Sequence, residues 1–229
     1  MCGRYSLTTP PEAVRRLFAL TTTPNFPARY NIAPTQSVPV VRPSDASGGG
    51  RELAMLRWGL VPSWASELSI GAKMINARAE TVSEKPAFRA AFRHRRCLVP
   101  ADGFYEWQVE GKNKQPMRIT LSDGGLFAFA GLWERWTKGL EGRLETFTII
   151  TTDASSSIAH IHERMPVMLE REDHEKWLDP RAGADDLKGL LRPFPPERLK
   201  AVAVSTRVNN VRHDDPACLE PFAMQGALL

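Results

Sequence analysis

Short apolar runs separated by turn residues dominate the second half of the chain. Such runs fall at residues 97–100, 102–107, 117–121, 126–133 and 146–152. Glycine-containing turn signals at 111–113, 123–125 and 139–142 separate the later ones. Runs of this length, bounded by turns, are typical of strands joined as hairpins. The pattern predicts a mainly antiparallel β-sheet.

The first half of the chain adds two strands and a long loop. Residues 38–42 and 52–58 alternate like strands and flank a Ser- and Gly-rich stretch at 44–50, which predicts a hairpin. Residues 59–73 show no periodicity and are expected to form an exposed loop. In the extended segment that follows, Asn76 and Arg78 alternate with small or apolar residues and are expected to share one face with Glu80.

Helical spacing of apolar residues is confined to short segments around these strands. Helices are expected at residues 13–20, 86–92, 155–160, 172–178 and 184–191, and a late strand at 199–204. No internal repeat is visible. The sequence therefore predicts an α+β fold, with one domain over residues 1–229 and a mainly antiparallel β-sheet core surrounded by peripheral helices.

Composition narrows the class of protein. The 229 residues are 42% hydrophobic and 24% charged, as in soluble globular proteins that bury a core of their own. No apolar run approaches the roughly 20 residues that span a bilayer, and no secretory signal is visible, so an intracellular, cytoplasmic protein without a membrane partner is expected. Three cysteines without paired spacing indicate neither a disulfide framework nor a zinc ribbon. The net charge of +4 is compatible with a polyanionic partner.

The start of the chain carries the most distinctive chemistry. Met1 is followed by Cys2, and we expect Met1 to be removed so that Cys2 bears a free α-amine with a pKa of roughly 7.7 to 8.0. Such an aminothiol can form a Schiff base with an aldehyde and then close through sulfur to a thiazolidine. The thiol could instead serve in acyl transfer, as in N-terminal nucleophile hydrolases. Cys2 could also be an ordinary residue at a frayed terminus.

Two other places carry candidate chemistry. Glu106 stands among Phe104, Tyr105 and Trp107, and a buried acid is costly unless it is paired with an arginine or used in catalysis. Strand alternation places Glu106 on the side of Phe104. His160 and His162 suggest a metal site, but no clustered ligands accompany them, so no metal is expected. The basic cluster at 93–96 is either a solvated helix end or a phosphate-attracting patch.

Four separated segments together resemble one protein family. They read Met-Cys-Gly-Arg at 1–4, Ile-Asn-Ala-Arg at 75–78, Asp-Gly-Phe-Tyr-Glu-Trp at 102–107 and Ile-His-Glu-Arg-Met-Pro at 161–166. In this order they resemble the SOS-response-associated peptidases (SRAP), and the match extends to residues 209–210. The resemblance implies the SRAP fold and a role in the DNA damage response. It implies a monomer without a cofactor that crosslinks Cys2 to the ring-opened aldehyde of abasic sites in single-stranded DNA, shielding the lesion on the nucleoid.

The resemblance also assigns roles to residues. Glu106 would hold the α-amine and shuttle protons, His162 would protonate the sugar ring oxygen and assist release of the crosslink, and Asn76 would position the sugar or the terminus. Without the family match, His162 would be read as a hydrogen-bonded structural histidine and Asn76 as a strand-end cap.

Contacts to DNA form a second group of implied roles. The arginines Arg4, Arg78 and Arg164 would clamp phosphates, or else pair with Glu80 or Glu163. The residues Asn31, Pro34 and Thr151 match backbone-contacting positions of the family. Trp64 would stack on or wedge between bases beside the lesion. Some relatives carry two adjacent tryptophans in this loop, whereas this chain has Trp64-Ala65.

Two rival functions stay open at this point. One is a cysteine peptidase or amidohydrolase that uses Cys2 as an N-terminal nucleophile and removes Met1 by autoproteolysis; its oxyanion hole cannot be read from the sequence. The other is a nucleic-acid-binding module without enzymatic activity, in which Cys2 is incidental.

Overall fold

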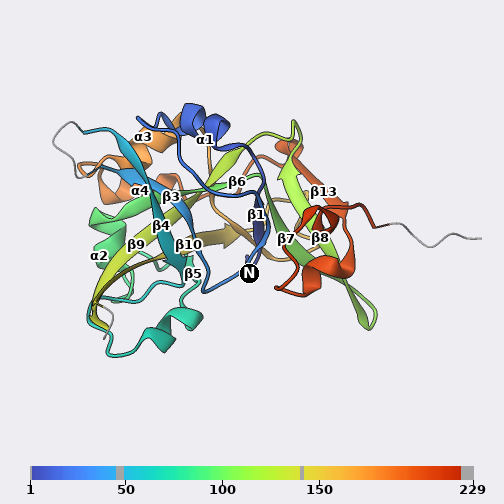
Figure 1. The fold of residues 1–229 in the computed structure, drawn as a ribbon, viewed down its shortest axis with the longest axis horizontal. Coiled ribbons are helices and arrows are strands. Elements are labelled where there is room, and N and C mark those ends of the chain that lie inside the picture. The colour runs from blue at the N-terminus through green and yellow to red at the C-terminus, as the bar shows by residue number, and fades with distance from the viewer. Residues whose placement is uncertain (1, 45–48, 140–141, 223–229) are drawn as a thin grey trace, which may run out of the picture.

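Pairing between strands builds two sheets that lie next to each other (Figure 1). The computed structural model describes residues 2–44, 49–139 and 142–222. The first sheet has the strand order β13-β8-β7-β1-β2. Its strands are β1 (Tyr5–Leu7), β2 (Arg29–Ile32), β7 (Gly103–Glu110), β8 (Asn113–Leu121) and β13 (Leu199–Ala203). Its pairings are all antiparallel.

The second sheet has the order β11-β10-β4-β3-β6-β9-β12, with β5 beside β10. Its strands are β3 (Ser37–Pro43), β4 (Arg51–Trp58), β5 (Asn76–Arg78), β6 (Arg96–Ala101), β9 (Phe127–Gly139), β10 (Gly142–Asp153), β11 (Arg164–Pro166) and β12 (Met168–Leu169). Because β9 pairs with both β6 and β10, the sheet closes on itself like a barrel. Only β4 and β5 run parallel to β10 within the described residues.

Short helices surround the sheets, as Figure 1 shows. They are α1 (Pro11–Phe18), α2 (Arg89–His94), α3 (Asp173–Leu178) and α4 (Ala184–Gly189), with 3-10 turns η1 (Leu68–Lys73), η2 (Pro196–Arg198), η3 (Thr206–Asn209) and η4 (Pro216–Cys218). The prediction of an α+β fold with a mainly antiparallel core is confirmed. No helix among the described residues is long and apolar enough to cross a membrane.

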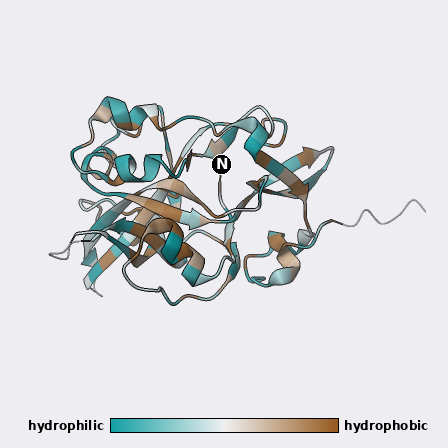
Figure 2. Cartoon of the chain, turned by 90° about the horizontal axis from the view of Figure 1, so that it is seen from above, coloured by the Kyte–Doolittle hydropathy of each residue, from teal (hydrophilic) through white to brown (hydrophobic). Residues whose placement is uncertain are grey.

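One core joins the two sheets. Tyr5 of the first sheet contacts Phe129 and Trp58 of the second, with ring centroids 5.8 and 5.3 Å apart. Figure 2 shows the hydrophobic residues concentrated along the central strands. Phe104 belongs to this core, whereas Tyr105 packs in a smaller cluster under the C-terminal segment. The two faces of β7 therefore differ as the alternation predicted.

The predicted hairpins form, and the boundaries of the helices shift. Strands β3 and β4 pair in register over their whole length, and β7 and β8 are joined at Gly111, whose φ is 62°. Parts of the predicted turns at 44–50 and 139–142 lie outside the described residues. Helix α1 starts earlier than predicted, at Pro11, and ends before Ala19, which is left-handed. Helix α2 starts later, at Arg89.

One predicted helix is wrong. Residues 155–160 form consecutive turns instead. The carbonyl of Ser155 accepts hydrogen bonds from the N–H groups of Ile158 and Ala159, and the next carbonyl along the chain that accepts such a bond is that of Ile158. The hydrogen-bond ladder therefore breaks after one turn. Strands β1 and β2 were not predicted, because they are short and depend on partners distant in sequence.

Candidate functional site

Strand pairing brings the start of the chain against β7. Tyr5 lies opposite Phe104, and the carbonyl of Arg4 accepts a hydrogen bond from the Tyr105 N–H at 3.0 Å. Residues 2–4 therefore run alongside the part of β7 that holds Glu106. The side chain of Cys2 is buried there, and its thiol donates to the Arg4 carbonyl at 3.9 Å.

A buried carboxylate anchors the other end of β1. Asp102 accepts hydrogen bonds from the Ser6 hydroxyl at 2.7 Å and from the backbone and hydroxyl groups of Thr8 and Thr9, and it pairs with Arg118 at 3.2 Å. Burial raises the pKa of Asp102, but the hydrogen bonds from Ser6 and Thr8 and the charge of Arg118 lower it below its usual value. This network fixes the strand that carries Cys2.

Glu106 lies in a different environment. Its side chain is buried on β7, and burial raises its pKa to about 7. The charge that most opposes this rise is that of the chain's amino terminus, not that of an arginine. A carboxyl group that titrates near neutral pH, close to the amino terminus, can exchange protons with an amine.

The pKa shifts of the Cys2 thiol and of the His162 imidazole both favour the neutral form of the group. Burial, and then the nearby Glu106 carboxylate, raise the pKa of the Cys2 thiol. Burial and then the charge of the amino terminus lower the pKa of His162. The Arg164 N–H donates to Nδ1 of His162 at 2.9 Å, so the proton of the neutral ring is on Nε2. Of these groups, Glu106 lies beside the start of the chain, because residues 2–4 run along the part of β7 that holds it.

Strand β10 gathers a second group of predicted residues. Asn76 and Arg78 on β5 lie opposite Ile149 and Thr151 of β10, and Thr151 lies opposite Pro166 on the other side. The amide nitrogen of Asn76 donates to the Ile75 carbonyl at 3.0 Å. Its Oδ1 is buried and has no hydrogen-bond partner among the described residues. Such an acceptor is costly to leave unpaired, and it is available to a bound ligand.

The three predicted phosphate-binding arginines differ in how far they are engaged. Arg4 donates to Asn31 Oδ1 at 2.9 Å and to the Val208 carbonyl at 2.7 Å. Arg164 pairs with Glu80 at 2.7 Å and with Asp153 at 2.6 Å. Arg78 is exposed, and its side chain makes no hydrogen bond or ion pair within the described parts of the chain.

The other predicted DNA contacts are scattered. Asn31 is fully buried, and its amide donates to three carbonyls of the C-terminal segment. Thr151 is buried and bonds to the Ala77 carbonyl at 3.5 Å, and Pro34 is half-buried. Trp64 is 55% exposed, in a hollow of about 400 Å³ that the structure does not connect to Cys2. Contact between DNA and the Asn31 side chain would require the C-terminal segment to move.

Two positioning features escaped the sequence analysis. One is Asp102, although it begins the motif at 102–107. The other is the segment 208–214, in which Asp214 accepts the N–H groups of Tyr30 and Asn31, and Asn209 accepts from the Trp107 indole at 2.7 Å. The pair Asn209-Asn210 was the only visible signal for it. This segment holds Arg4 and Asn31 against the first sheet.

The basic cluster at 93–96 is mostly structural. Arg96 is buried and donates to four backbone carbonyls, and Arg95 pairs with Glu134 at 2.6 Å. Only Arg93 and His94 are exposed. In residues 2–44, 49–139 and 142–222, no three His, Cys, Asp or Glu side chains come together as a metal site.

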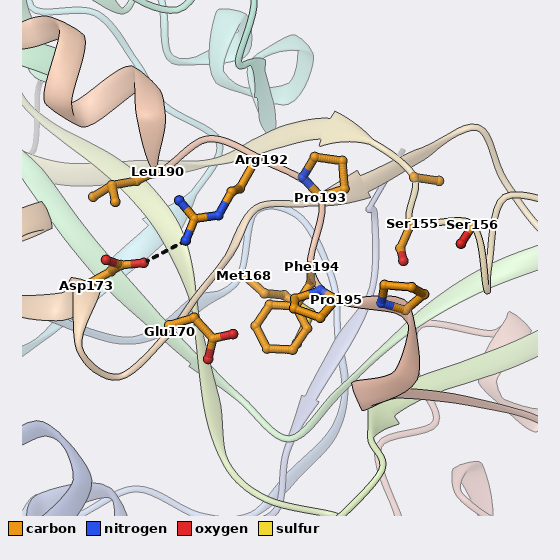
Figure 3. Close-up of a pocket in the computed structure, with 12 residues that line it drawn as sticks. Ser155, Ser156, Met168, Glu170, Asp173, Leu190, Arg192, Pro193, Phe194 and Pro195 are labelled. Atoms are coloured by element: carbon orange, nitrogen blue, oxygen red, sulfur yellow. Dashed lines mark hydrogen bonds and ion pairs between the residues drawn. The ribbon is translucent and has the colours of Figure 1, made fainter.

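A separate hollow of about 320 Å³ lies beside the turns that lead to His162 (Figure 3). Ser155 and Ser156 line one part of it, and Met168 and Phe194 another. An ion pair between Asp173 and Arg192, 3.5 Å long, lies at its edge. None of the predicted site residues lines this hollow, so the candidate site is the group around the amino terminus.

Comparison with known proteins agrees with this geometry. The profile of the SOS response associated peptidase (SRAP) family matches residues 1–211. Abasic site processing protein YoqW of Bacillus subtilis is 41% identical over 96% of this chain and 99% of its own. Abasic site processing protein HMCES of Xenopus tropicalis is 33% identical over 96% of this chain and 78% of its own.

A solved structure has the same fold. A crystal structure of a Bacteroides thetaiotaomicron protein superimposes with a TM-score of 0.85 at 30% identity, covering 97% of this chain and all of the other. Profile, relatives and fold agree over nearly the whole chain, and the chain therefore belongs to the SOS response associated peptidase family.

Proposed function

We propose that this protein processes abasic sites in single-stranded DNA by forming a covalent bond between Cys2 and the abasic sugar. The observation that carries the proposal is the position of Glu106, a buried carboxyl with a pKa of about 7, on the part of β7 along which Cys2 and the residues after it run. Two relatives that match along nearly the whole chain are named abasic site processing proteins, which supports the choice of substrate.

The first step of the proposed reaction is hydrolysis of the peptide bond between Met1 and Cys2. It consumes one water, releases methionine and leaves an α-ammonium on Cys2. Because Glu106 titrates near neutral pH, its ionised form accepts a proton from that ammonium and leaves a nucleophilic amine. Cys2 is buried, so the groups that cover its thiol must move before the sugar can reach it.

The condensation then proceeds in balanced steps. The amine adds to C1′ of the open-chain sugar, and the resulting carbinolamine loses one water to give an imine. The thiol sulfur adds to the same carbon, and its proton passes to nitrogen through Glu106. The product is a five-membered thiazolidine, and aldehyde plus aminothiol yield thiazolidine plus water.

His162 and Asn76 act on the sugar in this scheme. The Nε2–H of His162 donates to the ring oxygen as the ring opens, which fits the tautomer set by the Arg164 N–H. The unpaired Oδ1 of Asn76 accepts a hydrogen bond from a sugar hydroxyl. Arg78 is exposed on β5, opposite Thr151 of β10, and it holds a phosphate next to the abasic sugar.

A covalent-adduct assay tests the proposal. Wild-type protein should form one adduct, stable to denaturant, with a single strand that contains one abasic site, and none with an intact strand. Cys2→Ala should form no adduct, and Cys2→Ser only a Schiff base that survives after borohydride reduction. A stable adduct in Cys2→Ala would exclude the scheme, and retention that salt fully reverses would indicate simple binding.

Peptidase chemistry by the same thiol has less support. An acyl-transfer cysteine works as a thiolate, and burial together with Glu106 raises the pKa of Cys2. Addition to an imine carbon can use the thiol as its proton leaves through Glu106, so the condensation fits this environment better.

A further inference from the structure

The Arg164 side chain is nearly saturated by contacts within the protein. Its Nη1 donates to Glu80 Oε1 at 2.7 Å and to Asp153 Oδ1 at 2.6 Å. Its Nη2 donates to Glu80 Oε2 at 3.0 Å and to the Thr151 carbonyl at 2.8 Å. A guanidinium clamps a phosphate with the same paired N–H groups. Arg164 therefore cannot do so without releasing a carboxylate.

The two carboxylates stand on the solvent side of Arg164. The Arg164 side chain is 11% exposed, whereas those of Glu80 and Asp153 are 48% and 79% exposed. The group holds one positive and two negative formal charges. A phosphate that approaches Arg164 therefore meets acids first.

Arg78 provides the contrast on the neighbouring strand. It lies opposite Thr151, whose carbonyl Arg164 binds, and its charge acts on Glu80. No carboxylate binds the Arg78 guanidinium within the described residues. A DNA strand held at Arg78 would therefore pass close to Glu80 and Asp153.

We propose that Glu80 and Asp153 are specificity-determining residues, which occupy Arg164 and so weaken its hold on the phosphates of undamaged single strands. Intact DNA then dissociates readily, and lasting retention is left to the covalent step at Cys2. This inference rests on the proposed function. It assigns to the two acids a role beyond fixing an arginine in place.

Binding of intact single-stranded DNA, measured by fluorescence anisotropy on the full chain, tests the inference. Glu80→Gln should bind an intact oligonucleotide about fivefold more tightly than wild type, because it weakens two of the four hydrogen bonds that occupy the Arg164 guanidinium and removes one repelling charge. Its plot of log association constant against log salt concentration should be steeper by about 0.7, the contribution of one added phosphate contact on a single strand. Asp153→Asn should shift both quantities in the same direction.

Two controls isolate the contact from the change in charge. Glu84→Gln makes the same charge change at an exposed carboxylate that does not touch Arg164, and it should leave the salt slope unchanged. Arg164→Gln should abolish the increase in salt slope when combined with Glu80→Gln, yet weaken binding by less than about twofold on its own. Asp153→Asn decides the question if Glu80→Gln fails to fold.

The outcomes separate this inference from the proposed function. Equal affinity and equal salt slope in Glu80→Gln, Asp153→Asn and Glu84→Gln would overturn the specificity role, even if wild type forms the abasic adduct. Absence of that adduct in wild type would overturn the proposed function, whereas the comparison on intact DNA would still report on the two acids.

Discussion

Two carboxylates are buried against the start of the chain, Asp102 just before strand β7 and Glu106 within it, and their surroundings shift their pKa values in opposite directions. Asp102 is 5% exposed and Glu106 is 4% exposed. At Asp102, hydroxyl and backbone donors and Arg118 lower the pKa of the carboxyl despite burial. At Glu106, burial prevails and raises the pKa to about 7. The supply of donors, not the degree of burial, decides which acid is structural and which can move protons.

The two acids also lie at different places along β1 and have different roles there. The Asp102 network holds Ser6, Thr8 and Thr9, so the strand enters the site in a fixed register. Glu106 lies where the same strand delivers Cys2. In the proposed scheme, the reactive terminus would thus be held in position by a carboxylate at the far end of the strand.

Replacing Asp102 by Ala should have the largest effect. It leaves Arg118 and several donors buried without their acceptor, so the free energy of unfolding should fall by about 3 to 5 kcal/mol. Glu106→Gln, an isosteric change at the other end, should be at least as stable as wild type at pH 8, where it avoids a buried charge. Urea denaturation of both variants measures this. Equal losses in the two variants would contradict the division of roles.

The pH dependence of stability gives a second, somewhat smaller effect. The pKa of Glu106 is raised from 4.5 to about 7 in the folded state. The stabilisation of the fold that this shift provides is complete below pH 4.5 and is lost as pH rises through 7. His174 is buried against Phe18, and burial, then Arg51, lower its pKa from 6.5 to about 4. Its contribution is complete above pH 6.5 and is lost as pH falls toward 4.

These two contributions oppose each other, at about 3 kcal/mol each. In the wild type, the Glu106 contribution should therefore offset most of the stability that His174, together with His162, loses on acidification between pH 6.5 and 4.5. Glu106→Gln should lose stability on acidification across that range, because the lowered pKa values of His174 and His162 then act unopposed, and His174→Gln should shift the slope in the other direction. Denaturation midpoints at half-unit pH intervals measure both slopes. A flat profile in Glu106→Gln would show that Glu106 does not titrate as described.

Catalysis should show the third effect. Glu106→Gln should slow adduct formation at pH 7 about 100-fold, equal to about 2.7 kcal/mol at the barrier. The wild-type rate should fall as pH drops through 7, because the carboxylate becomes protonated, and the variant should lose this inflection. Single-turnover rates on an abasic strand test both points. A wild-type rate in the variant would leave Glu106 without a role.

Much of this fold could be predicted from periodicity, and the misses are of two kinds. The hairpin of β3 and β4 follows from alternation within one local stretch. Strands β1 and β2 do not, because a three- or four-residue strand acquires its structure from partners about 100 or 25 residues away, such as Phe104 and Ile32 opposite Tyr5. At residues 155–160 the error was the reverse, because the local spacing of apolar residues predicted a helix and the backbone forms only turns.

The candidate site shows the same division. Cys2 and Glu106 were proposed from the chemistry of a terminal aminothiol and of an acid among aromatic residues, together with the resemblance of four sequence segments to one family. Two sets of contacts could not be predicted: the ion pair of Arg164 with Asp153, and the hydrogen bonds of Asn31 to the segment 208–214. No motif or regular spacing in the sequence links the residues that make them.

Intact-mass spectrometry of the protein, before and after incubation with an abasic single strand, tests the central claim most directly. We expect a chain that begins at Cys2, and then a single product heavier by one DNA strand less one water, with the modification mapping to Cys2. A protein that keeps Met1 and still forms the adduct, or an adduct that maps elsewhere, would contradict the account.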